Sequence, residues 1–178
     1  FGSVKRVNIL RDEDSFKRNL NLYVLSENVD GNFVVPTQTI KENLRTWISR
    51  FKMLNDTIDI FNGEFVNLKL SYEVVSGFDV NKYDLLVRCN EALKKKFNVK
   101  YNMGESFYLS DVYITLNAIS GVVDTTDVVV QTKSNAGYSQ YPFNANEHLS
   151  NDGRVLRAPD KVAFEIKDFD ADITGVIK

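Results

Sequence analysis

The sequence predicts an α+β fold, in which a mixed β-sheet carries two main amphipathic helices and one short helix packed on one face. Three observations predict it. Apolar residues recur at helical spacing after Thr39, residues 64–75 alternate between apolar and polar, and the predicted elements follow the order strand, helix, strand, helix, helix, strand and closing hairpin. The chain has 178 residues, of which 43% are apolar and 26% are charged. This length and composition are typical of a globular protein with a sizeable core.

Three regions are expected along the chain. Residues 1–19 are polar and of mixed charge, which is typical of a linker or an edge segment. Residues 20–132 hold the clearest helix and strand patterns, so we expect them to form the α+β core domain. Residues 133–178 comprise a long loop, rich in Asn, Ser and Gly over 133–153, and the closing C-terminal strands.

The first strand of the core is predicted at Leu20–Ser26. Apolar residues occupy both of its faces, which is typical of a central strand covered on both sides. Asp30-Gly31 then predicts a turn, because glycine readily adopts the positive φ that tight turns need. We expect Phe33–Val35 to pair back as a short strand.

The first helix has the clearest signals in the sequence. Thr39 and Glu42 have the spacing of a capping box, in which each side chain accepts a hydrogen bond from the other residue's backbone N–H. The apolar stripe of this helix comprises Ile40, Leu44, Trp47, Ile48 and Phe51. Because this stripe and the alternation of the following strand fit together, we expect it to be buried against Val66, Leu68 and Leu70.

The strand at residues 64–75 and the helix after it complete the predicted helix-on-sheet layers. The strand's apolar face comprises Val66, Leu68, Leu70, Tyr72 and Val74, and its wet face comprises Asn67, Lys69, Ser71 and Glu73. The helix is expected to begin at a cap on Asp79 and to end near Phe97. Its inward stripe is predicted to comprise Tyr83, Leu86, Val87, Asn90, Leu93 and Phe97.

The remaining elements are shorter. A helix is predicted over Ser110–Ile119, with Ser110 as its cap, and Gly121 is expected to end it. Residues 122–132 are typical of a strand. Two closing strands are predicted at residues 162–166 and 173–177, and the element order implies that they form a hairpin. The inward residues of the short helix are predicted to be Val112, Tyr113, Leu116 and Ile119.

Charge and cysteine content exclude several classes of function. Lys and Arg number 22 against 24 Asp and Glu, so the formal charge is −2 and the chain lacks a basic footprint for nucleic acid or an anionic membrane. One cysteine allows no intramolecular disulfide. No apolar run is long enough for a membrane span, and no signal-peptide pattern opens the chain.

The residues that could carry chemistry lack the partners that chemistry needs. Asp168, Asp170 and Asp172 alternate like the start of a calcium loop, but Ile173 stands where that loop needs glycine. A solvated acidic turn is therefore the favoured interpretation. His148 is the only histidine and has no predicted metal or base partner. Cys89 lies one turn from Leu86 and Leu93, so core packing is favoured over reactivity. We expect no catalytic residue, metal or cofactor.

One stretch, "FNGEFVNLKL", supports an alternative function as a nucleic-acid-binding module of RNA-recognition type. Such a strand needs glycine, alternating aromatic residues and a basic lead residue. Phe65-Val66 matches this pattern. The remaining aromatic positions fall on Gly63 and Leu68, and the basic lead position is Phe61. Together with the acidic balance, these departures make the interpretation the weaker one.

Several blocks of the sequence resemble one known family. They are "FGSVKRVNILRDEDSFKRNLNLYVLSENVDGNFVVPTQTIKENLRTWISRFKMLNDTIDI", "FVNLKLSYEVVSGFDVNKYDLLVRCNEALKKKF" and "YLSDVYITLNAISGVVDTTDVVV". In this order they resemble the C-terminal region of baseplate wedge proteins of contractile-tailed phages, the T4-like members of the baseplate-J-like group. The resemblance covers roughly residues 1–132.

The resemblance implies a non-enzymatic structural protein of the virion that works in assembly and tail contraction. It implies a place in the tail baseplate, assembly in the host cytoplasm, and contacts with copies of itself, as a dimer or ring, and with other wedge subunits. It implies no catalytic residues, cofactor, nucleic acid or membrane. The chain begins with Phe1 instead of Met, which favours an excised part of a longer protein. An enzyme fragment whose active site lies in the missing part is the remaining alternative.

The candidate interface residues lie in the 133–153 loop. Tyr138, Tyr141 and Phe143 bring large contact areas at a small cost in conformational entropy, which suits an interface. The alternative is a mobile loop whose aromatic side chains pack back onto the domain. Both interpretations are carried forward to the structure.

Overall fold

The computed structural model describes residues 4–12, 19–53, 56–134 and 136–178. Its helices and strands form an α+β fold, so the predicted fold class is confirmed. The described residues build two four-stranded sheets and a two-stranded sheet, which replace the single mixed sheet that was predicted. They also divide into two compact units, and one boundary lies within β5 (Glu64–Ser76), between Phe65 and Val66. A single core domain over 20–132 does not match this division.

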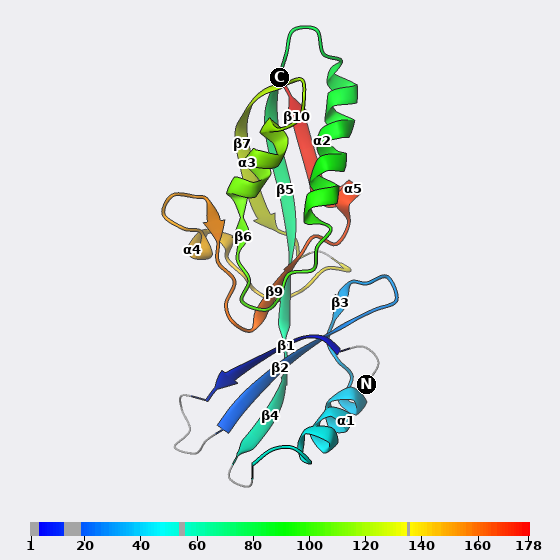
Figure 1. Ribbon diagram of the computed structural model, residues 1–178, viewed down its shortest axis with the longest axis vertical. Coiled ribbons are helices and arrows are strands. Elements are labelled where there is room, and N and C mark those ends of the chain that lie inside the picture. The colour runs from blue at the N-terminus through cyan, green and yellow to red at the C-terminus, as the bar shows by residue number, and fades with distance from the viewer. Residues whose placement is uncertain (1–3, 13–18, 54–55, 135) are drawn as a thin grey trace. The chain divides into compact units, whose positions relative to one another are not determined.

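The first unit contains the described residues up to Phe65, together with Asn102–Glu105 and Ala158–Ala163. Its central strand has an antiparallel neighbour on one edge, and a short antiparallel strand and a parallel strand share the other edge. One helix completes the unit (Figure 1). Its elements are β1 (Val4–Arg11), the central β2 (Asn19–Glu27), β3 (Phe33–Val34), α1 (Gln38–Ile48) and β4 (Thr57–Asn62).

Strand β2 is central, as predicted, and the predicted turn at Asp30-Gly31 follows it. Gly31 has a φ of 79°, and its N–H donates to the carbonyl of Asn28 at 3.0 Å. Phe33 pairs back with Glu27 of β2, which confirms the short strand. Residues 1–19 were predicted as a linker or edge segment, and within that range the described Val4–Arg11 form the edge strand β1.

Close packing fixes the middle of the first unit. Leu25, Phe33 and Ala163 form a buried cluster, and Phe65 and Met103 pack against it. Gly63 passes so close to this cluster that a Cβ there would lie 2.3 Å from the Met103 Cε atom. A side chain at this position would therefore displace its neighbours.

The predicted cap of α1 is wrong. The helix starts two residues earlier, and its N-cap is Thr37, whose carbonyl accepts from the Lys41 N–H at 3.3 Å. Thr39 already has helical conformation, so it cannot take the extended conformation of an N-cap. Glu42 instead accepts from the Gln38 side chain at 3.1 Å.

The predicted burial of the α1 stripe is also wrong. No residue of α1 is buried, and Trp47 and Phe51 are 47% and 70% exposed. Leu44, Trp47 and Ile48 face the β1–β2–β4 side of the first unit, whereas Val66, Leu68 and Leu70 belong to the second unit. Matched periodicities show which residues share a face, but they carry no information about which two faces meet.

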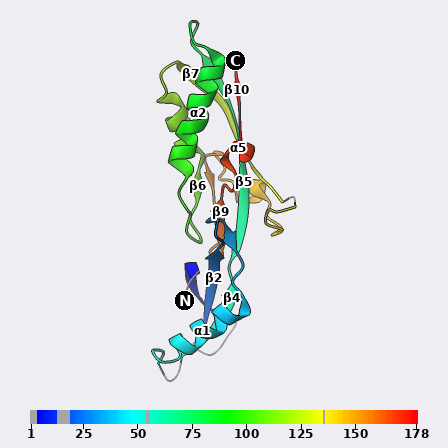
Figure 2. The ribbon, with the colours of Figure 1, turned by 90° about the vertical axis from the view of Figure 1, so that its right-hand side faces the viewer.

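The second unit is built around β5, with α2 and the 136–148 segment on opposite sides of its sheet (Figure 2). Strand β5 pairs antiparallel with one neighbour and parallel with the C-terminal strand. The other elements are α2 (Lys82–Phe97), β6 (Phe107–Tyr108), α3 (Leu109–Asn117), β7 (Val122–Thr132), α4 (Ala145–His148), β8 (Val155–Leu156), α5 (Phe169–Asp172) and β10 (Ile173–Ile177). The division also crosses β9 (Val162–Glu165), whose first two residues belong to the first unit and whose last two belong to the second.

The strands of this unit follow the predicted bounds closely, but the closing hairpin is wrong. Both β9 and β10 pair with β5. Strand β5 is 13 residues long, and β10 uses only its Leu70–Val74 stretch, so the strand has room for a second partner elsewhere. The apolar face of β5 is buried as predicted: Val66, Leu68, Leu70, Tyr72 and Val74 are each at most 3% exposed.

Helix α2 buries a different stripe from the predicted one. Its N-cap is Asn81 in place of Asp79, and Tyr83 and Val87 are 84% and 55% exposed. Leu93 and Phe97 belong to both the predicted and the observed stripe. The observed stripe continues toward the start of the helix in steps of four residues, through Cys89 and Leu85. The buried residues are Leu85, Cys89, Leu93 and Phe97. The burial of Cys89 is therefore confirmed.

Helix α3 lies close to its prediction. It covers Leu109–Asn117 after an N-cap at Tyr108, so Ser110 is not the cap. Val112 and Leu116 are fully buried, as expected, while Tyr113 and Ile119 are half-buried. Gly121 has a φ of 99°, a left-handed conformation that suits the chain reversal after a helix.

Candidate functional site

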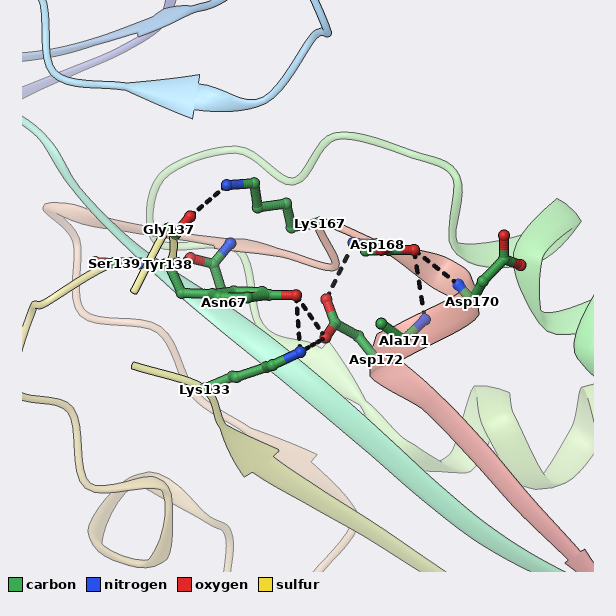
Figure 3. Close-up of polar contacts among 10 residues, drawn as sticks. All are labelled: Asn67, Lys133, Gly137, Tyr138, Ser139, Lys167, Asp168, Asp170, Ala171 and Asp172. Carbon is green, nitrogen blue, oxygen red and sulfur yellow. Dashed lines mark hydrogen bonds and ion pairs between the residues drawn. The ribbon is translucent and has the colours of Figure 1, made fainter. Parts of the chain in front are cut away.

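The first feature of interest is a cluster of buried polar side chains in the second unit, drawn in part in Figure 3. Two carboxylates form its centre: Asp172 is fully buried and Glu165 is 3% exposed. A buried carboxylate is costly unless charged and hydrogen-bonding partners surround it. Each of these two has a lysine and a second polar partner.

Asp172 was predicted to lie in a solvated acidic turn, and for this residue the prediction is wrong. Asp168 caps α5 by accepting from the backbone N–H groups of Asp170 and Ala171. Asp172 turns back and accepts from the Asp168 N–H at 3.0 Å, so the turn closes on itself (Figure 3). Asp170 does remain exposed and forms an ion pair with Lys94 at 3.8 Å.

Lys133 and Tyr138 complete the surroundings of Asp172. The Lys133 Nζ atom lies 2.6 Å from the Asp172 Oδ1 atom, and the Tyr138 hydroxyl donates to the same oxygen at 3.1 Å. The hydrogen bond that Lys133 donates to Asp172, followed by the one that it donates to the Tyr138 hydroxyl, raises the pKa of the Lys133 amine. Lys133 is therefore held protonated, which fits an ion pair and does not fit a nucleophilic amine.

Glu165 is held in a comparable way by Lys100 and Asn67. The Lys100 Nζ atom lies 3.0 Å from one carboxylate oxygen, and the Asn67 amide donates to the other at 3.0 Å. Asn67 was predicted on the wet face of its strand, but it is fully buried. Its side-chain oxygen accepts from the Ser139 N–H at 2.8 Å, and this bond draws the loop onto β5.

The start of the loop is therefore anchored at several points, which we call the loop anchor: Asn67, Lys133, Tyr138, Glu165 and Asp172. Its hydrogen bonds join β5, the end of β7, the loop, the end of β9 and α5. Lys167 adds a bond from its Nζ atom to the Gly137 carbonyl. Fully satisfied polar networks of this kind fix one arrangement of the chain.

The three candidate interface residues pack back onto their own unit. The Tyr138 ring has the Lys133 and Lys167 ammonium groups 4.1 Å and 5.3 Å from its centre. Phe143 stacks on His148 with the ring centres 4.6 Å apart, and its edge meets Phe164 at 5.6 Å. This geometry matches the alternative in which the aromatic side chains of the loop pack back onto the domain.

Tyr141 is half-buried and, with Phe143, lines a cavity of about 300 Å³ beneath the loop. The packing of the three aromatic side chains leaves their role in an interface a prediction. Half-burial still leaves part of each ring available to a partner.

The second feature of interest is an apolar groove in the first unit, between α1 and the sheet beneath it. Its volume is about 300 Å³, and every residue that lines it is apolar. Trp47 of α1 and Val7 and Ile9 of β1 form its open side, at 47%, 48% and 56% exposed. Phe51 is 70% exposed and extends this apolar surface, since its ring lies 4.8 Å from that of Trp47.

Among the residues that the structure describes, no other arrangement of reactive groups stands out. Cys89 is fully buried, and that burial raises the pKa of its thiol. In the described ranges, no three His, Cys, Asp or Glu side chains gather as a metal site would require. Over the same residues, no helix is both long and apolar enough to span a membrane.

Sequence reasoning missed most of the loop anchor. One signal was present: Glu165 stands inside the apolar run "VAFEI", where a charge without a partner would be costly. Asn67 gave no such signal, because polar residues alternate along its strand. Lys133 and Lys100 lie far from Glu165 and Asp172 in sequence, so their pairing depends on the fold.

The geometry defines an α+β protein with a tightly anchored loop in one unit and an open apolar groove in the other. No family model matches the chain, and no curated protein matches it. The function is therefore inferred from these two features and from the sequence resemblance described above.

Proposed function

We propose that the chain is a structural component of a contractile phage tail baseplate, which acts through protein–protein contacts in virion assembly and tail contraction. Its partners are copies of itself and other wedge subunits, and it carries no catalytic site. The resemblance over residues 1–132 supports the baseplate assignment. The structural observation that supports work through contacts is the apolar groove with its exposed residues.

An apolar groove that is open to solvent lowers the solubility of a protein. Its presence therefore indicates a surface that a partner covers. Contiguous exposed apolar surface is typical of sites that other proteins cover. In this chain, Trp47, Phe51 and Ile9 are neighbours of one groove, so they form a continuous surface. A subunit that holds its partners through such a surface leaves it uncovered when it stands alone.

The nucleic-acid alternative has one observation in its favour. Tyr23 and Phe61 stack with ring centres 5.7 Å apart, and Phe61 is 44% exposed. Exposed aromatic rings can stack on bases. However, strand alternation places Asp59 on the same face, where it would repel phosphate, and Phe65 packs against the buried cluster of the first unit. Protein contacts therefore have the stronger support.

Co-expression tests the proposal. The chain is produced with the products of its neighbouring genes, and each mixture is analysed by size-exclusion chromatography with light scattering. We expect a stoichiometric complex with at least one neighbour, and the chain should be found in purified virions by mass spectrometry. A chain that stays alone with every neighbour and is missing from virions would contradict the proposal.

A further inference from the structure

We infer that the apolar groove of the first unit binds an acidic amphipathic helix of a partner protein. This inference rests on the proposed function, since it assigns a chemical class of partner to the surface that supports it. Three observations carry it: the uneven cover of the sheet by α1, the apolar lining of the groove, and nearby arginines that form no ion pair with any described residue.

Helix α1 covers only part of the sheet face on which it lies. Leu22 and Val24 of the central strand are 4% and 0% exposed, whereas Ile9 and Val7, their partners on β1, are 56% and 48% exposed. The cover is therefore good over β2 and poor over β1. The uncovered strip runs along β1 and is bordered by Trp47 of α1.

This geometry fits a helix better than an added strand. A sheet face is covered by helices packed side by side, each about 10 Å across. A helix laid beside α1 over β1 would contact Val7, Ile9 and Trp47 together. A strand added at the edge of β1 would extend the sheet but leave these side chains exposed. An amphipathic helix in an apolar groove is also a common way for proteins to recognise one another.

The charges around the groove select an acidic partner. Arg11 lies beside Leu20 on the same face of the sheet, Arg50 follows α1, and Arg45 lines a small pocket that adjoins the groove at Ile48. In the part of the chain that the structure describes, none of these three arginines forms an ion pair. Glu42, the one acidic residue of α1, is hydrogen-bonded to Gln38.

The same charges argue against the same surface of a second copy as the occupant. In a symmetric pair, the groove of each copy would face the other, and the arginines would be brought together. Like charges that face each other across an interface oppose association. A helix with acidic residues beside an apolar stripe would instead pair with Arg11, which lies next to the lining residue Leu20.

Trp47 makes the inference directly measurable, because it is the only tryptophan of the sequence. The probe is a synthetic helical peptide of about 18 residues, with a leucine stripe flanked by glutamates and no tryptophan. The control peptide has lysine in place of each glutamate. Fluorescence anisotropy of each labelled peptide and the emission of Trp47 in the full 178-residue chain are followed together.

We expect the acidic peptide to bind saturably, to shift Trp47 emission to shorter wavelength, and to bind more weakly as salt is raised. The basic peptide should bind at least about tenfold more weakly. Ile9→Asp should weaken the acidic peptide by about tenfold or more, because it places a charge in the apolar strip. This residue is already exposed, so the fold is expected to persist, and circular dichroism checks it.

Charge reversal at the rim separates specific pairing from general attraction. Arg11→Glu should weaken the acidic peptide roughly three- to fivefold and strengthen the basic one. Lys95→Glu on α2 makes the same change of charge at an exposed site of the other unit and should leave both affinities unchanged. An equal effect of Lys95→Glu, equal affinity for the two peptides, or no effect of Ile9→Asp would overturn the inference.

The two proposals fail in distinguishable ways. A complex with neighbouring gene products that forms equally well with Ile9→Asp would contradict the groove inference and leave the proposed function standing. Peptide binding with the expected charge preference, in a chain that forms no complex and is missing from virions, would support the groove and contradict the baseplate function. No shift of Trp47 emission at peptide concentrations up to about 1 mM would contradict the groove inference.

Discussion

The two units of this chain treat their amphipathic helices in opposite ways. Helix α2 of the second unit buries Leu85, Cys89, Leu93 and Phe97, whereas α1 of the first unit buries none of its residues. Sequence periodicity predicts an apolar stripe in both helices. The difference teaches that an apolar stripe marks a surface that needs cover, and that the cover can come from the same chain or from a partner.

The largest difference is expected in the free energy of unfolding, when a leucine of α2 and a leucine of α1 are each replaced by alanine. Leu93→Ala should lower the free energy of unfolding by about 2–5 kcal/mol, because this side chain is fully buried and its loss leaves a cavity. Leu44→Ala makes the same change at a half-buried position and should cost clearly less. Urea unfolding of both variants compares them. Equal losses would mean that α1 is packed as tightly as α2.

The next largest effect on stability is expected when a residue of the loop anchor is replaced. Asn67→Ala removes the partner of both Glu165 and the Ser139 N–H, and we expect it to cost about 1–3 kcal/mol, because buried polar groups are left unpaired. Ser71→Ala on the same strand removes only an exposed hydroxyl contact with Thr174 and serves as the control. The two variants are compared by thermal unfolding. A loss for Asn67→Ala no larger than that of the control would show that the anchor does not stabilise the second unit.

The burial of Tyr72 should make the stability of the second unit depend on pH at high pH. Burial, followed by the nearby Cys89, raises the pKa of Tyr72. Because the folded chain keeps this proton after the unfolded chain has lost it, the stability that Tyr72 provides is complete below about pH 10 and falls as the pH rises further. The sequence has eight tyrosines, and we expect one of them to ionise only when the chain unfolds.

Absorbance of tyrosinate against pH measures this. Tyr72→Phe should remove the late-ionising group, and Tyr83→Phe, at an 84% exposed position, should leave that group in place and serves as the control. If Tyr72→Phe leaves the late-ionising group in place, or if no group ionises late, Tyr72 is accessible to solvent and the second unit is more open than its packing indicates.

The smallest effect is expected at the loop. If the chain associates with itself through the 133–153 loop, Tyr141→Ala should weaken that association by several-fold without changing the fold, because Tyr141 is half-buried and the loop anchor does not include it. Sedimentation velocity over a wide range of concentration measures the change. An unchanged dimer would place the self-contact elsewhere, and a strict monomer at high concentration would remove this surface from the proposal for this chain.

The comparison also shows how far the sequence could lead. Alternation gave the buried face of β5, and the turn at Gly31 and the strand at 122–132 followed from local signals, since backbone and side-chain preferences decide them. The start of α1 was missed because Thr37 and Thr39 are both acceptable caps, and only the fold chooses between them. The buried stripe of α2 was missed for a similar reason, since Tyr83 and Val87 are apolar enough to suggest a second inward face.

The loop anchor and the groove lay beyond local patterns. Asn67 has the sequence signature of a solvent-facing residue, and its burial depends on Glu165 and Ser139, which lie far along the chain. The groove depends on α1 covering β2 more completely than β1, and no spacing of residues encodes this. Long-range pairing therefore decided the parts of the candidate site that sequence reasoning did not find.

The central claim is that the apolar face of α1 is a contact surface that partners cover. Acrylamide quenching of Trp47, measured in the free chain and in a complex with a co-expressed neighbour, tests it most directly. We predict efficient quenching in the free chain, because Trp47 is 47% exposed, and clear protection in the complex. A Trp47 that is already protected in the free chain, or one that is quenched equally in the complex, would contradict the claim.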